Sequence, residues 1–352
     1  MMKKAYDIKI SDLKDLLTVL KQHSYESTVQ IDVYRLSNYI KRYERNFSDQ
    51  QIPLYERLID DADEVHFYKP FYPYSKVFSK IGREQTELSF STSYTPIQMS
   101  DEQVVDDAVS FFEDKGDFFR AQFRDFCGEA QDHLKFIDDK SETAGETLTL
   151  KSTGEAFVFV PNYSNITKFT ILVHESEHVI DFFNNPNFLD VHIISETAAV
   201  FMELLSCDFI AKKYNLFDDN FQRRNYLHSI IKSQATILKD KIKLLDLVNK
   251  NRFLEEDSLL KLLNKKGYPT EDIKYFLEAT IEQDSAYQLP YLIAIELYVI
   301  YHKNKQLALK VLEDIIMNAN QYNIFDVLRK YGININEHIL EYENLLYKKI
   351  TL

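Results

Sequence analysis

Apolar residues recur at α-helical spacing along most of this chain, and this pattern limits the possible fold more than any other sequence feature. Leu13, Leu16, Leu17 and Leu20 are an early example. Similar patterns predict helices over about 34–43, 54–59, 100–126 with a kink or break at Gly116, 168–183 and 193–213, and over the remainder with breaks near 267–269, 290 and 332. The chain is therefore expected to be mostly α-helical.

Two segments depart from this helical pattern. Residues 87–94 have strand-like composition within a stretch rich in Tyr, Phe, Ser and Thr, which predicts a short hairpin or an extended connector. Residues 155–161 also predict a strand, and the proline that ends it favours an edge position over a central one. Residues 138–154, directly before this strand, are expected to form a loop.

The composition argues against several classes of protein. The 352 residues carry 42 Lys and Arg against 55 Asp and Glu, a net charge of −13, which argues against a nucleic-acid binder. The longest apolar run, near 289–301, contains Glu296 and is too short to span a bilayer, so no membrane association is expected. No secretory signal is recognised, and Cys127 and Cys207 cannot form a disulfide framework, so a cytoplasmic location is expected.

The chemically informative motif is His-Glu-x-x-His at residues 174–178, inside a helical segment without Gly or Pro. Residues four apart share a helix face, so His174 and His178 can bind one cation, with Glu175 beside it in the position of a general base. The apolar run 169–173 suggests a buried helix, where histidines next to carboxylates need partners that a metal supplies. The alternative is a core helix with hydrogen-bonded histidines.

A catalytic zinc site commonly has three protein ligands and one water, and the third ligand should lie on another element. The next helix is otherwise apolar and offers Glu196 and Glu203 on one face, two turns apart. We expect His174, His178 and Glu196 to bind one Zn²⁺ per chain, with Glu203 accepting a hydrogen bond from a ligand histidine. Glu203 is equally compatible with a surface carboxylate or a structural ion pair.

Hydrolysis by such a site also needs a donor for the negative charge that develops on the substrate oxygen. Tyr287 and Tyr291 are the candidates, because a phenol can donate a hydrogen bond without carrying charge. With 23 tyrosines in the chain, packing is the commoner role for any one of them.

The motif and its flanking segments together resemble the thimet oligopeptidase / oligoendopeptidase F family of zinc peptidases. The matching segments are, in chain order, 119–126 with 138–140, 157–163, 172–178, 195–203 and 319–332. The resemblance implies a gluzincin-type metallopeptidase, helical with a small β-sheet beside the metal-binding helix. Its catalytic region would span residues 99–352, after an N-terminal helical region with a short extended connector over 1–98.

This resemblance implies a zinc-dependent endopeptidase that hydrolyses internal bonds of short peptides, with Glu175 as general base. The strand at 157–161 could then pair with an extended peptide substrate. The oligomeric state is not predicted.

The sequence also departs from the family pattern at four places. Glu177 replaces the usual Gly, Asp181 and Ser285 stand where His is common, and residues 318–320 replace a pair of glycines. These departures favour an alternative function, a catalytically degenerate peptidase-like protein that binds peptides or a partner without cleavage. A helical scaffold whose motif is accidental is a third interpretation.

Overall fold

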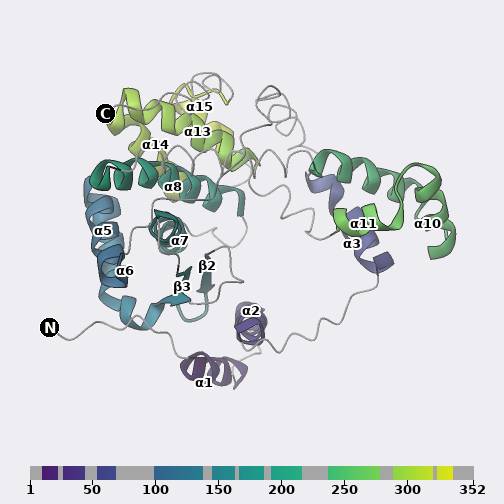
Figure 1. Cartoon of the computed structure of the whole chain (residues 1–352), viewed down its shortest axis with the longest axis horizontal. Helices are drawn as coiled ribbons and strands as arrows, with labels where there is room; N and C mark the ends of the chain where they lie inside the picture. Colours follow the sequence, from purple (N-terminus) through teal and green to yellow (C-terminus); the bar gives the residue numbers. More distant parts are fainter. Residues whose placement is uncertain are drawn as a thin grey trace. The chain divides into compact units, whose positions relative to one another are not determined.

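The computed structural model describes residues 10–22, 27–43, 54–68, 99–137, 145–162, 166–185, 192–215, 237–277, 288–319 and 323–335. The helices are α1 (Ile10–Gln22), α2 (Ser27–Tyr43), α3 (Leu54–Tyr68), α5 (Asp101–Asp114), α6 (Asp117–His133), α7 (Ile166–Asn184), α8 (His192–Tyr214), α10 (Glu256–Lys265), α11 (Thr270–Phe276), α13 (Gln288–Lys303), α14 (Lys305–Asn318) and α15 (Ile324–Lys330), and residues 237–251 are helical too (Figure 1). The strands are β1 (Leu134–Ile137), β2 (Glu146–Leu150) and β3 (Glu155–Pro161). The predicted helical fold with a small sheet is confirmed.

The chain forms two compact units, each assembled from separate segments. One unit contains residues 1–48, 91–224 and 294–352, and the other contains residues 49–90 and 225–293. The division at residues 98 and 99 is a different partition of the chain, and it stays a prediction.

Helix α7 lies at the centre of the first unit. It packs against α8 on one side and against β2 and β3 on another, with α5 and α6 also in contact (Figure 1). Phe169, Leu172 and Val173 are completely buried in this packing. The prediction that the motif helix is buried is therefore confirmed.

Strand β3 is central in the sheet, so the prediction of an edge strand was wrong. The strand order is β1-β3-β2, with β1 parallel and β2 antiparallel to β3. Pro161 is tolerated because it ends the strand, and the next residue, Asn162, donates its backbone N–H to the Ile137 carbonyl at 2.7 Å. The ladder therefore continues past the missing proline donor.

Strand β2 lies in the segment that was expected to be a loop, so that expectation was wrong as well. Its register pairs Glu146 with Phe159 and Leu150 with Glu155. Leu148 and Leu150 are buried in a cluster with side chains of α1 and α2. Apolar contacts with distant helices stabilise this short strand, and no local sequence signal announces such contacts. The other predicted β segment, 87–94, lies outside the described residues.

Several predicted helix ends are observed in the structure. Ser100 caps α5 by accepting a hydrogen bond from the Gln103 N–H at 3.2 Å, and Gly116, with φ of 111°, separates α5 from α6. Pro290 instead lies inside the first turn of α13, where its missing N–H is not needed, so it does not break the helix.

Among the described residues, we find no helix that combines the length and the apolar character needed to cross a membrane.

Candidate active site

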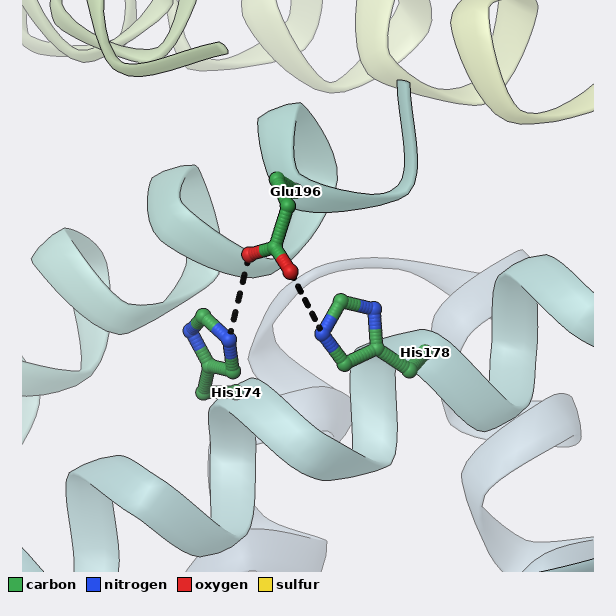
Figure 2. Close-up of side chains that lie close together, drawn as sticks. All are labelled: His174, His178 and Glu196. Atoms are coloured by element: carbon green, nitrogen blue, oxygen red, sulfur yellow. Dashed lines mark ion pairs between the residues drawn. The ribbon is translucent and has the colours of Figure 1, made fainter. Parts of the chain in front are cut away.

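His174 and His178 lie one turn apart on α7 and face the second turn of α8. Figure 2 shows both imidazole rings directed at the Glu196 carboxylate. The Nε2 atom of His174 lies 3.5 Å from Glu196 Oε2, and the Nε2 atom of His178 lies 3.6 Å from Glu196 Oε1. The three side chains are 12–14% exposed, and the Oε2 atom of Glu196 is itself buried.

This arrangement fits a divalent cation. One ligand atom from each of His174, His178 and Glu196 lies within 4.8 Å of the other two. Ligands about 2.1 Å from a tetrahedral zinc ion lie roughly 3.4 Å from one another. The two histidine–carboxylate separations are close to that value, and two imidazoles with one carboxylate are a usual donor set for zinc.

The outer nitrogens of both rings are also in contact with oxygen atoms of α8. His174 Nδ1 lies 3.2 Å from Glu203 Oε2, and His178 Nδ1 lies 2.5 Å from Ser195 Oγ. Glu203 is buried, so it is not a surface carboxylate. Contacts at Nδ1 fix the ring orientation and leave Nε2 directed at Glu196.

The charge on His174 depends on these carboxylates. Burial lowers the pKa of the imidazole, but hydrogen bonds with Glu196 and Glu203 raise it well above its ordinary value. Without a cation, the ring therefore holds a proton between two acids. A bound cation would replace that proton, so metal binding and protonation would compete at this site.

Glu175 lies on α7 beside the two histidines and is buried against strand β2. Its Oε2 atom accepts a hydrogen bond from Thr147 Oγ at 2.7 Å, and its backbone carbonyl lies 3.0 Å from the same hydroxyl. Burial raises the pKa of Glu175 to about 7, although His174 and Thr147 oppose the shift. A carboxylate with this pKa can both accept and return a proton near neutral pH.

Gly145, next to β2, leaves the space that the Glu175 side chain occupies. A Cβ atom at position 145 would lie 2.6 Å from both Cγ and Oε1 of Glu175. Any other residue there would displace the carboxylate or the strand.

The two tyrosines are not tested as donors. Tyr287 lies outside the described residues. Tyr291 is fully buried in the part of α13 that belongs to the second compact unit. Their proposed role stays a prediction.

Two of the departures from the family pattern place acids inside the protein. Glu177 and Asp181 lie one turn apart on α7 and are almost completely buried. Burial raises the pKa of Asp181 to about 7, and burial together with Asp181 raises that of Glu177 well above its usual value. Among the described residues, none forms a hydrogen bond of normal geometry with either carboxylate. Ser285 and Asn320 are outside the described residues.

Sequence reasoning missed three residues of this site, namely Gly145, Thr147 and Ser195. Thr147 in β2 and Gly145 just before it lie next to Glu175, in a segment that was expected to be a loop. Ser195 directly precedes Glu196, and that position was its only signal. Its contact with His178 depends on how α8 crosses α7.

Comparison with known proteins gives structural matches only. No family model and no curated protein matches the chain. A protein assigned as an oligoendopeptidase F from Bacillus anthracis str. Ames matches with a TM-score of 0.52 and 12% identity, over 90% of this chain and 62% of that one. PZ peptidase A, determined with an inhibitor, matches with a TM-score of 0.54 and 11% identity, over 94% of this chain and 66% of that one.

A third match points to the same fold. A protein assigned as a peptidase from Chlamydophila abortus has a TM-score of 0.50 and 13% identity, over 97% of this chain and 62% of that one. The chain has an oligopeptidase-like fold. It spans less than two thirds of the length of these proteins.

Proposed function

We propose that this protein is a zinc-dependent endopeptidase that cleaves internal bonds of short peptides. The observation that carries the proposal is the convergence of His174, His178 and Glu196 on one point, with Glu175 beside them. The oligopeptidase-like fold supports it, because all three matching proteins described above carry peptidase names.

The residues of the site have complementary roles in this proposal. His174, His178 and Glu196 would hold a zinc ion, which polarises a carbonyl oxygen and lowers the pKa of a bound water to about 7. Glu175 takes a proton from the attacking water and later delivers it to the leaving amine. Its pKa of about 7 suits both steps. Glu203 accepts a hydrogen bond from His174 Nδ1 and keeps Nε2 directed at the ion.

Strand β2 is the better position for the peptide backbone. Strand β3 cannot receive a substrate strand, because β1 and β2 occupy both of its edges. Among the described residues, β2 pairs with β3 alone, and its first residues lie next to Glu175. An extended peptide that adds to the outer edge of β2 would bring its backbone close to the general base. Tyr287 and Tyr291 remain the candidates for the oxyanion donor.

The test is a zinc determination on purified protein combined with digestion of a mixed-peptide library, with and without a chelator. We expect about one zinc per chain and cleavage of internal bonds that stops with the chelator and returns with added zinc. Stoichiometric zinc without cleavage would support the degenerate, peptide-binding alternative. Absence of zinc would contradict both and favour a helical scaffold.

A further inference from the structure

The two histidines among the candidate zinc ligands have different hydrogen-bond partners at Nδ1. His174 Nδ1 faces a carboxylate directly, that of Glu203 at 3.2 Å. His178 Nδ1 faces a neutral hydroxyl, that of Ser195 at 2.5 Å. A ligand histidine usually donates this second N–H to a carboxylate, a carbonyl or water, so the hydroxyl needs an explanation.

The hydroxyl of Ser195 can accept a hydrogen bond from His178 and donate another one onward. When Nε2 of a neutral imidazole faces a cation, the proton is on Nδ1, so His178 donates and Ser195 Oγ accepts. Ser195 then has one hydrogen left to donate. Its side chain is 4% exposed, so that hydrogen needs an acceptor inside the protein.

Asp181 is an acceptor that itself needs a donor. It lies on α7 three residues after His178, and its side chain is 1% exposed. Neither of its carboxylate oxygens has a hydrogen-bond partner of normal geometry among the described residues. Burial raises the pKa of Asp181 to about 7, while Asn185 and Ser195 are close enough to lower it. Ser195, which contacts His178 and has one hydrogen to donate, is therefore near a buried carboxyl group that has no hydrogen-bond partner of normal geometry among the described residues.

We propose that Asp181 and Ser195 are positioning residues, and that with zinc bound a hydrogen-bond chain runs from His178 Nδ1–H to Ser195 Oγ and from Ser195 Oγ–H to the Asp181 carboxylate. This chain rests on the proposed zinc site. In this chain each ligand histidine is held in place by a carboxylate. His174 contacts its carboxylate directly, and His178 reaches its carboxylate through the Ser195 hydroxyl. It also gives a role to Asp181, a residue at which this sequence departs from the family pattern.

The competing acceptor is a backbone carbonyl of α8. A serine in a helix can donate to the carbonyl three residues earlier, which here is that of His192 at the start of α8, and in that case Asp181 would not act through Ser195. The two arrangements differ in one respect. Only the first makes the effects of Ser195 and Asp181 on zinc binding depend on each other.

The experiment measures zinc affinity of the full chain by competition with a chromophoric chelator. The first pair of variants is Ser195→Thr and Ser195→Val, which have the same shape and differ by the hydroxyl. The second is Asp181→Asn, which keeps the shape and removes the charge. We expect Ser195→Val to bind zinc roughly 10-fold more weakly than Ser195→Thr, and Asp181→Asn to show a similar loss relative to the parent protein. Circular dichroism of the zinc-free variants verifies that each is folded.

The double variants decide the question. In a shared chain, Asp181→Asn weakens zinc binding in the Ser195→Thr background and has little further effect in the Ser195→Val background. Additive losses would mean that Asp181 acts only through its charge and would overturn the proposal. Glu177→Gln is the matched control, since it replaces another buried carboxyl group of α7, and we expect its zinc affinity to equal that of the parent.

The outcomes also separate this inference from the proposed function. A parent protein that binds no zinc contradicts both. A parent that binds zinc and cleaves peptides, with equal affinities in the Thr and Val variants, contradicts only the hydrogen-bond chain.

Discussion

Helix α7 carries buried polar side chains on two faces, which differ in the polar partners that the described residues provide. On the face toward α8, His174 and His178 meet oxygen atoms of Glu196, Glu203 and Ser195 at 2.5–3.6 Å. Away from these contacts, Glu177 is completely buried, and no described residue forms a normal hydrogen bond with its carboxylate. The first face satisfies its polar groups in a geometry suited to a cation, whereas the carboxyl group of Glu177, whose pKa burial raises well above its usual value, has no such partner among the described residues.

This difference teaches that burial alone does not identify the functional acids of the helix. Glu175 and Glu177 are both buried and both have raised pKa values. Only Glu175 lies beside the converging ligands and accepts a hydrogen bond from Thr147. We therefore expect changes at the two histidines, at their partners on α8 and at Glu175 to alter zinc binding and catalysis, and changes at Glu177 to alter mainly stability.

The largest effect should come from Glu175→Gln. The amide cannot accept the proton of the attacking water, so we expect peptide cleavage to fall by about 10²- to 10⁴-fold while zinc content is kept. Initial rates with one cleaved peptide, together with zinc determination, measure this. Glu177→Gln is the control and should cleave at the parent rate. An equal loss of cleavage rate in both variants would contradict the distinction between Glu175 and Glu177.

A smaller effect is expected for Glu203→Gln. The neutral amide supports His174 less well than a carboxylate, so zinc affinity should fall by about 10- to 100-fold. Chelator competition provides the measurement. An unchanged affinity would show that the contact of 3.2 Å at Nδ1 is a structural ion pair and not a support for the metal ligand.

The Glu177→Met variant is expected to be more stable than the parent protein. Methionine has a similar length and no polar atoms that need partners, so the free energy of unfolding should rise by about 1–3 kcal/mol. Urea denaturation of the zinc-free protein tests this. Glu175→Met is the comparison, because the Glu175 carboxylate is also buried but has a hydrogen-bond partner in Thr147. A destabilised Glu177→Met variant would mean that this carboxylate has a partner in the folded protein.

The last prediction concerns the pH dependence of stability. The pKa of Asp181 is 3.8 in the ordinary state and about 7 in the folded protein, so between these values the folded state retains a proton that the unfolded state has lost. The zinc-free protein should therefore become less stable as the pH rises from about 4 to 7. His174, whose pKa is raised well above its ordinary 6.5, contributes in the same direction only above about pH 6.5, where the unfolded chain loses this proton first.

Thermal unfolding across this pH range is the measurement, and Asp181→Asn should reduce the slope. An equal slope in parent and variant would show that Asp181 does not titrate in this range.

The part of the site built by one helix was predictable from the sequence. Residues at 174 and 178 share a face of any α-helix, and the next helix presents residues 196 and 203 on a single face by the same rule. Local spacing is enough for such statements. The roles of these residues remain proposals, although their side chains do meet.

The contacts between separate elements were not predictable in this way. The central position of β3, the strand at 146–150 and the approach of Thr147 to Glu175 all depend on segments that are distant in sequence. Edge and centre positions were confused because a terminal proline is compatible with both.

By itself, then, the sequence determined the helical fold class and the residues able to hold a cation, because helix periodicity is set by local backbone geometry. Tertiary structure alone decided which oxygen atom contacts the Nδ1 atom of each imidazole and which strand borders Glu175. Those choices follow from the packing of α7 against α8 and the sheet, where burial of distant apolar side chains sets the crossing of the elements.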